Sequence, residues 1–158
     1  MPSGARAKHL QARARVRIVL DTNVVMSALL WRGKPYQLLQ AVRQRSDVQI
    51  YSSAVLLQEL ADVLTRPSAT KRLALIGKTV HDVLADYVEA VELVEPATVP
   101  RVVPSDADDD HVIAAAVAAG ATLIVSGDSD LLSMGSHQGI EISSAAMAVE
   151  TVGAKGKI

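Results

Sequence analysis

The sequence predicts an α/β fold in which helices cover both faces of a central parallel sheet. Apolar runs of strand length alternate along the chain with segments that carry helical periodicity, and this order is typical of parallel sheets. The run from Val16 to Leu20 is apolar at nearly every position, as expected of a strand that is buried on both faces. Glycine, proline and serine residues separate these runs and mark the connections.

Five strands and seven helices are expected in alternating order, and several helix starts carry a capping residue. Strands are predicted at residues 16–20, 48–51, 91–94, 121–126 and 140–142. Helices are predicted at residues 24–31, 35–45, 53–65, 70–76, 80–90, 107–118 and 144–151, with a short helical turn near Leu131. Thr22 or Asn23 is placed near the first N-cap, and Ser52 or Ser53 caps the helix after the second strand.

Glycine and proline residues set the helix ends. The segment Gly33 to Pro35 breaks the first helix, and Pro67 stops the helix that follows the second strand. Gly120 closes the helix 107–118, because glycine is the usual residue just beyond a helix C-terminus.

One globular domain is expected to occupy residues 16–152. Of the 158 residues, 49% are hydrophobic and 21% are charged, which is ordinary for a domain that buries a core. Residues 1–15 are predicted to be a mobile basic tail, interpreted as a solvated extension with phosphate contact as the alternative. Residues 153–158 are predicted to be a loose C-terminal tail.

Composition and motifs exclude several classes of function. Because the chain has no cysteine, a disulfide framework, a zinc finger and a thiol nucleophile are excluded. The net charge of −1 argues against a protein that coats nucleic acid along its whole surface. No apolar run is long enough to span a membrane and no signal-peptide pattern occurs, so we expect a cytoplasmic protein without a membrane partner. Walker A, G-x-S-x-G and G-x-G-x-x-G motifs do not occur.

Acidic residues gather where predicted strands end. Asp21 comes directly after the first strand, Asp128 and Asp130 follow the fourth strand, and a run from Asp106 to Asp110 opens the helix before it. The carboxyl ends of parallel strands share one edge of a sheet, so these carboxylates should converge. Two charges ~4 Å apart repel by about 4 kcal/mol at an effective dielectric of about 20, so a neutralising cation is expected. Carboxylate oxygens suit a hard divalent metal, which indicates metal-assisted chemistry on an anionic substrate.

Asp21 and Asp128 also have structural interpretations. Asp21 could cap the first helix, but Thr22 and Asn23 are also good caps, so a functional role is favoured for Asp21. Asp128 could belong to a Gly-Asp-Ser-Asp turn. The presence of Asp21 and Asp110 favours a functional role for Asp128.

Helical periodicity favours Asp110 within the run of acids. Asp110 lies three residues before Ile113 and seven before Val117, both of which are core-facing positions, and it is expected to point toward the sheet. Asp109 is nearly as well placed. Asp109 and Asp106 are nevertheless interpreted as capping or solvated residues, because acids also favour the positive end of a helix dipole.

Other polar residues could complete the candidate site. Thr22, Asn23 and Ser126 are expected to orient a carboxylate or a metal-bound water, with turn and cap roles as the alternative. Glu59 lies at the edge of the apolar stripe of its helix, and its spacing alone favours a solvent-facing side chain. The histidines follow no metal-ligand spacing and are interpreted as surface or packing residues: His9, His81, His111 and His137.

Four blocks of this sequence, in order, resemble the PIN-domain nucleases. RIVLDTNVVMSAL at 17–29 looks like the first strand and acidic corner of that family, and SAVLLQEL at 53–60 looks like its second acidic helix. DADDDHVIAAA at 106–116 and IVSGDSDLL at 124–132 look like the third and fourth acidic blocks. The match covers residues 16–152. It is most similar to the toxin components of toxin–antitoxin pairs that are related to VapC toxins.

The resemblance implies a three-layer PIN-like fold with strand order 3-2-1-4-5. It implies Mg²⁺ or Mn²⁺ as cofactor, hydrolysis of RNA phosphodiester bonds to 5′-phosphate and 3′-hydroxyl ends, a homodimer and a cognate antitoxin protein. It assigns catalytic and metal-binding roles to Asp21, Glu59, Asp110 and Asp128, with Asp130 as a further metal ligand.

Substrate attraction and two alternative functions complete the expectations. An acidic site needs basic side chains to attract RNA, and the candidates are Arg32, Lys34, Arg43, Arg45, Arg66 and the N-terminal arginines. A nucleophilic-Asp phosphatase would need a second Asp at Asn23, and a phosphorylated receiver would need a Lys that residues 123–132 lack. A non-catalytic PIN-fold module that binds RNA or protein is the other alternative.

Overall fold

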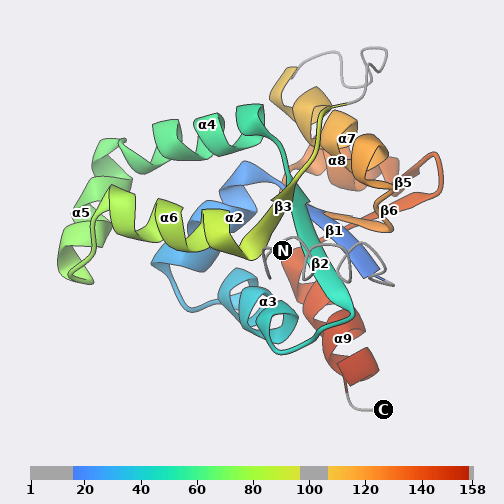
Figure 1. Ribbon diagram of the computed structural model, residues 1–158, viewed down its shortest axis with the longest axis horizontal. Helices are drawn as coiled ribbons and strands as arrows, with labels where there is room; N and C mark the ends of the chain where they lie inside the picture. The colour runs from blue at the N-terminus through green and yellow to red at the C-terminus, as the bar shows by residue number, and fades with distance from the viewer. Residues whose placement is uncertain (1–15, 97–106, 157–158) are drawn as a thin grey trace, which may run out of the picture.

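In the computed structural model, which describes residues 16–96 and 107–156, the strands form one six-stranded sheet (Figure 1). The strands are β1 (Val16–Leu20), β2 (Val48–Ser52), β3 (Val91–Leu93), β4 (Leu123–Val125), β5 (Ser136–His137) and β6 (Ile140–Ser143). The helices are α2 (Thr22–Leu30), α3 (Lys34–Arg43), α4 (Ala54–Leu64), α5 (Pro67–Leu75), α6 (Val80–Ala90), α7 (Ala107–Ala119), α8 (Ser129–Met134) and α9 (Ala145–Gly156). No helix among the described residues is both long and apolar enough to cross a membrane.

The predicted α/β class is confirmed, with one difference in the sheet. The strand order is β3-β2-β1-β4-β6-β5, so β6 takes the place of the predicted fifth strand. The additional strand β5 runs antiparallel to β6, with Ser136 opposite Glu141. Gln138 and Gly139, with φ of 49° and 81°, form the two-residue turn between them. A two-residue strand leaves no periodic signal in a sequence, which is why the prediction of a wholly parallel sheet is wrong at this edge.

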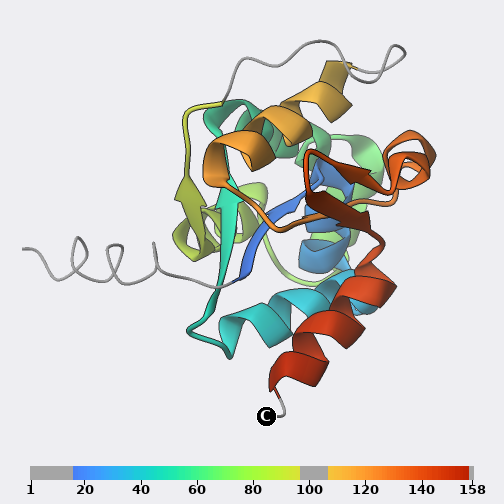
Figure 2. The same cartoon turned by 90° about the vertical axis from the view of Figure 1, so that its right-hand side faces the viewer.

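Helices cover both faces of the sheet, as predicted. Alternate residues of the strands face opposite ways. Ile18 and Ile50 pack against the side that carries α2 to α6 and α9, whereas Val19 and Ile124 pack against α7 and α8. Figures 1 and 2 show α3 and α9 on one side of the sheet and α7 on the other. The domain is therefore a three-layer sandwich around two apolar cores.

Several boundaries differ from the prediction, among them the start of the first helix and the end of the last one. The first helix begins at Thr22 rather than at residue 24, and Asp21 occupies its N-cap position. At the other end of the chain, α9 continues to Gly156, past the predicted start of a loose tail at residue 153. The buried Val152 holds α9 against the core, and the Val152 carbonyl accepts a 2.6 Å hydrogen bond from Arg45 Nη1. The predicted tail at 1–15 and Asp106 lie outside the described residues.

Pairing between β1 and β4 aligns the ends of the two strands that carry acids. The strands are parallel, and Leu20 lies beside Val125 at their carboxyl ends. Asp21 N donates to Val125 O at 2.9 Å, which extends the pairing by one residue. The residues that follow the two strands, Asp21 and Ser126, therefore leave the sheet side by side.

Candidate metal centre

Asp21 stands at a helix N-cap without serving as its side-chain cap. Its carbonyl accepts the first helical hydrogen bonds of α2, but its carboxylate makes no capping bond. Asp21 Oδ2 instead accepts a 2.7 Å hydrogen bond from Ser126 Oγ. Asp21 is only 9% exposed and Ser126 is fully buried. The structural interpretation of Asp21 as a cap is therefore excluded for its side chain, which is turned toward the end of β4.

Ser126 connects Asp21 to the loop that carries Asp128. The backbone N–H of Asp128 donates to Ser126 Oγ at 2.9 Å, while the same hydroxyl donates to Asp21. Asp128 is the N-cap of α8, and its Oδ1 accepts a 2.7 Å hydrogen bond from Asp130 N. One carboxylate oxygen of Asp128 is thus used locally, so the other can serve a ligand.

The structure brings Asp109, rather than Asp110, to this group of carboxylates. Asp109 is 3% exposed and lines the same pocket as Asp21 and Asp128, whereas Asp110 is not among the pocket residues. Asp109, Asp128 and Asp130 each present an oxygen within 4.8 Å of the others. The interpretation of Asp109 as a solvated residue is therefore wrong, and Asp110 as a metal ligand stays a prediction.

The buried stripe of α7 explains this choice. Val112, Ile113 and Ala116 are buried against the second face of the sheet. Asp109 lies three, four and seven residues before them, which places it in the middle of the stripe. Asp110 shares a face with Ile113 and Val117, and Val117 is only half-buried. The periodicity argument used Ile113 and Val117 as core positions, and because Val117 is only half-buried it favoured Asp110 over the more deeply buried Asp109.

Glu59 approaches the pocket from the opposite wall, on α4. Its side chain is 21% exposed, so the solvent-facing orientation expected from spacing alone is wrong. Glu59 Oε1 accepts a 3.4 Å hydrogen bond from Thr22 Oγ1, and Glu59 Oε2 lies 2.5 Å from His111 Nδ1. His111 was not expected at the site, since helical spacing separates it from the neighbouring acids of its own helix. Only the packing of α7 beside α4 brings it to Glu59.

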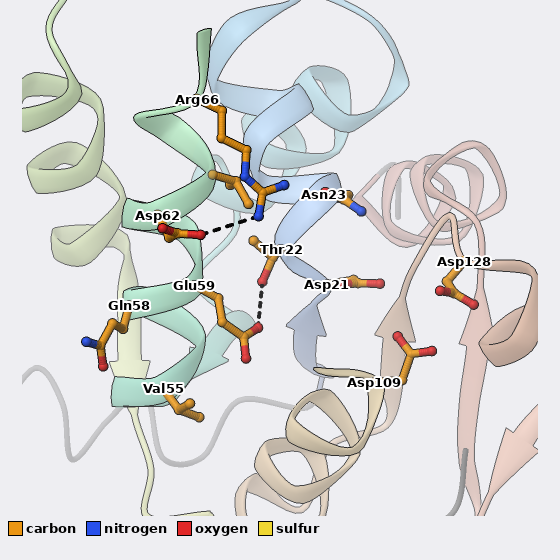
Figure 3. Close-up of a pocket in the computed structure, with 11 residues that line it drawn as sticks. Asp21, Thr22, Asn23, Val55, Gln58, Glu59, Asp62, Arg66, Asp109 and Asp128 are labelled. Carbon is orange, nitrogen blue, oxygen red and sulfur yellow. Dashed lines mark hydrogen bonds and ion pairs between the residues drawn. The ribbon is translucent and has the colours of Figure 1, made fainter. Parts of the chain in front are cut away.

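Asp21, Thr22, Glu59, Asp109 and Asp128 line an open pocket with a volume of about 500 Å³. In Figure 3 the carboxylates of Asp21, Asp109 and Asp128 converge on one side, and Glu59 faces them from α4. The lining continues along one face of α4 through Val55, Gln58, Asp62 and Val63, and it ends at Arg66, the N-cap residue of α5. Thr22 and Asn23 complete the rim at the start of α2. The pocket is therefore a groove with an acidic end and with Arg66 at its other end.

The donor set fits a hard divalent cation. Asp21, Glu59, Asp109 and Asp128 supply carboxylate oxygens from four separate segments, and no lining residue offers nitrogen or sulfur at the convergence point. Burying a carboxylate as fully as Asp109 is costly unless a partner compensates its charge. Among the lining residues Arg66 is the single base, and its ion pair at 3.3 Å is with Asp62. Cation binding at the acidic end would relieve the remaining repulsion.

Comparison with known families decides the assignment. A family model described as PIN domain matches residues 17–130, well over half of the chain. The chain belongs to the PIN-domain family. The matched region of this PIN domain contains every carboxylate of the pocket and ends at Asp130. PIN domains are in general metal-dependent nucleases that act on nucleic acids. No curated protein matches the chain.

Replacing Ser126 by Ala should loosen the centre of this PIN-domain site. The change removes one donor to Asp21 and the acceptor of the Asp128 N–H. Loss of a buried hydrogen-bond partner typically costs about 1–3 kcal/mol, and loss of a group that supports a metal ligand lowers metal affinity roughly 10–100-fold. Urea unfolding and Mn²⁺ titration would measure the two effects.

Ser133→Ala is the matched control, because Ser133 Oγ donates only to a carbonyl within α8 and is exposed. Its stability should stay within about 0.5 kcal/mol of wild type. Equal stability and equal Mn²⁺ affinity in the Ser126 and Ser133 variants would contradict the bridging role of Ser126.

Proposed function

We propose that this protein is a metal-dependent endoribonuclease. The observation that carries the proposal is that Asp21, Asp109 and Asp128 line one pocket at the carboxyl edge of β1 and β4, where Asp109, Asp128 and Asp130 present oxygens within 4.8 Å of one another. These four aspartates and Glu59 would hold Mg²⁺ or Mn²⁺. Such an ion supplies Lewis acidity that acidifies a water molecule and stabilises charge on phosphoryl oxygens.

The side chains of the chain itself position the reactants. Ser126 fixes the orientation of Asp21 by donating a hydrogen bond to its carboxylate. The α8 N-cap bonds fix Asp128 in the same way. Fixed carboxylates bring a phosphodiester and a water molecule together in one geometry, which lowers the entropic part of the barrier. No serine, cysteine or lysine nucleophile is needed for such a hydrolysis, and the expected products carry 5′-phosphate and 3′-hydroxyl ends.

Arg66 is the basic residue that supports an RNA substrate in this groove. Of the basic candidates named from the sequence, Arg66 lines the pocket, whereas Arg43 pairs with Asp86 and the largely buried Arg45 pairs with Asp47. Arg66 is 64% exposed, and an exposed pair such as Arg66–Asp62 contributes at most about 1 kcal/mol. A phosphate can therefore replace Asp62 as the partner of Arg66. With few aromatic residues in the chain, base stacking is a minor contribution.

Arg66→Ala should weaken substrate binding more than turnover. Arg66 lies just beyond the C-terminal end of α4, away from Glu59 along the groove, so it would contact a phosphate beside the one that is cleaved. We expect a rise in KM for single-stranded RNA with nearly unchanged kcat, and a salt dependence of binding that falls by about 1 in slope. Arg43→Ala, on the surface away from the groove, is the control. A fall in kcat at constant KM would contradict this role.

The cellular role that we propose is that of a toxin in a toxin–antitoxin pair. It rests on the similarity of the four acidic blocks to toxin components of such pairs. The proposal includes a cytoplasmic location, a homodimer and inhibition by a small cognate antitoxin protein. A neighbouring gene for a small DNA-binding protein, and growth arrest on expression without that protein, would support it.

Cleavage of end-labelled single-stranded RNA tests the proposed activity. We expect internal cleavage in Mg²⁺ or Mn²⁺, none in EDTA, and recovery when the metal is restored. Single-stranded DNA of the same sequence tests the preference for RNA. Binding of RNA without cleavage at any metal concentration would favour the non-catalytic module. Release of inorganic phosphate from monoesters without internal cleavage would favour an acidic-pocket phosphatase.

A further inference from the structure

His111, which is not one of the predicted site residues, contacts the carboxylate of Glu59 on the α4 side of the pocket. His111 Nδ1 lies 2.5 Å from Glu59 Oε2, although 52 residues separate the two in the sequence. His111 extends from α7 and Glu59 from α4, so the contact spans the two walls of the site. His111 is 40% exposed, which leaves its ring at the rim rather than within the apolar core.

The direction of the hydrogen bond follows from the chemistry of the two groups. An ionised carboxylate can only accept hydrogen bonds. The N–H at His111 Nδ1 is therefore the donor of the hydrogen bond to Glu59 Oε2. A hydrogen bond to an ionised acceptor is among the stronger kinds in proteins. By contrast, Thr22 Oγ1 donates to Glu59 Oε1 at 3.4 Å, which is long for a hydroxyl. Of these two hydrogen bonds, the one with His111 is the shorter and the stronger restraint on the orientation of Glu59.

The two carboxylate oxygens of Glu59 therefore have different partners. Oε2 is turned toward α7 by His111, and Oε1 is left toward Thr22 and the pocket (Figure 3). Without His111 the long side chain of Glu59 would regain several rotamers, and a ligand would have to fix it on binding. Preorganisation of this kind increases affinity without adding any contact to the ligand.

The first turns of α7 thus serve both sides of the pocket. His111 follows Asp109 by two residues, so their side chains point about 200° apart around the helix. Asp109 meets the Asp128 side, and His111 meets Glu59 on α4. Any shift of α7 would displace both Asp109 and His111, the hydrogen-bond partner of Glu59.

We propose that His111 is a positioning residue that holds Glu59 in the orientation needed for divalent-metal binding. The proposal rests on the metal-dependent function proposed above and adds to it a residue outside the carboxylate set. Metal ligands in proteins are commonly held by a further hydrogen bond, and loss of that bond lowers metal affinity roughly 10–100-fold. His111 would supply this bond for Glu59.

Mn²⁺ affinity of the full-length protein, measured by calorimetry or electron paramagnetic resonance, tests the proposal without any substrate. We expect His111→Ala to weaken Mn²⁺ binding roughly 10–100-fold. His111→Asn, whose amide N–H can donate to Glu59, should recover most of the affinity. In the Glu59→Gln background, His111→Ala should cause no further loss, because the two residues act through one contact. His81→Ala, on the exposed surface of α6, is the control for removal of an imidazole.

The outcomes separate this inference from the function on which it rests. Wild-type protein that binds no Mn²⁺ would overturn the metal-dependent function and the role of His111 with it. Wild-type protein that binds Mn²⁺ beside a His111→Ala variant of equal affinity would overturn the role of His111 alone. So would a His111→Asn variant as weak as His111→Ala, or additive losses in the Glu59→Gln background. Circular dichroism of each variant shows whether it is folded.

Discussion

We expect Asp21→Asn to abolish RNA cleavage while leaving the fold intact. Asn keeps the size of Asp and retains an oxygen that can accept the hydrogen bond from Ser126 Oγ. It removes the negative charge from the residue that stands at the end of β1, in contact with the end of β4. Metal-assisted charge stabilisation contributes several kcal/mol to a transition state, and each 1.36 kcal/mol is a factor of ten in rate. A loss of at least about 100-fold follows.

The measurement is cleavage of labelled RNA at saturating Mn²⁺, beside thermal unfolding of the same preparations. Asp86→Asn is the matched control, because Asp86 is an exposed carboxylate on α6 that forms an ion pair with Arg43 on the surface. It should cleave as wild type does. If Asp21→Asn turned over at the wild-type rate, Asp21 would have no place in the chemistry.

The second large effect is the difference between Asp109→Asn and Asp110→Asn. Asp109 is buried in the pocket within reach of Asp128, whereas Asp110 lies outside the pocket lining. We expect Asp109→Asn to lose at least about 100-fold in cleavage, for the reason given for Asp21. Asp110→Asn should lose only a few-fold. Side-by-side rates at several Mn²⁺ concentrations check both expectations.

The two variants also test which aspartate serves the site: Asp109, which the structure places in the pocket, or Asp110, which the sequence periodicity favoured. A large loss of cleavage in Asp110→Asn, with little loss in Asp109→Asn, would identify Asp110 as the residue that serves the site. It would also mean that α7 begins in a different rotation when metal is bound. Equal losses would assign both aspartates to the site.

Strand-end geometry made much of this site predictable. Asp21 and Asp128 could be placed together because parallel strands end on one edge, and that rule depends only on recognising two buried strands. The capping alternative for Asp21 could not be rejected from the sequence, since Asp, Thr and Asn all cap helices well. Only the hydrogen bond to the buried Ser126 shows that the carboxylate is turned away from the helix.

The remaining differences arise where function depends on contacts between helices. Asp109 and Asp110 differ by about 100° around α7, an angle smaller than the uncertainty of a periodicity argument over a short helix. His111 was set aside because the histidines follow no metal-ligand spacing and because His111 points about 100° away from Asp110, yet its partner lies on α4. Arg66 could not be related to the groove until α4 was placed beside α2. Helix-to-helix placement, which local patterns do not encode, decided the cases of His111 and Arg66.

An anomalous difference map from crystals grown with Mn²⁺ tests the central claim most directly, because it shows whether the dispersed acids share an ion. We expect a peak in the pocket, bonded to carboxylate oxygens of at least two of Asp21, Asp109 and Asp128, with Glu59 toward it from α4. Such a peak should be absent in crystals of Asp21→Asn at the same Mn²⁺ concentration. A fully occupied Mn²⁺ elsewhere on the molecule, with these carboxylates unliganded, would contradict the account.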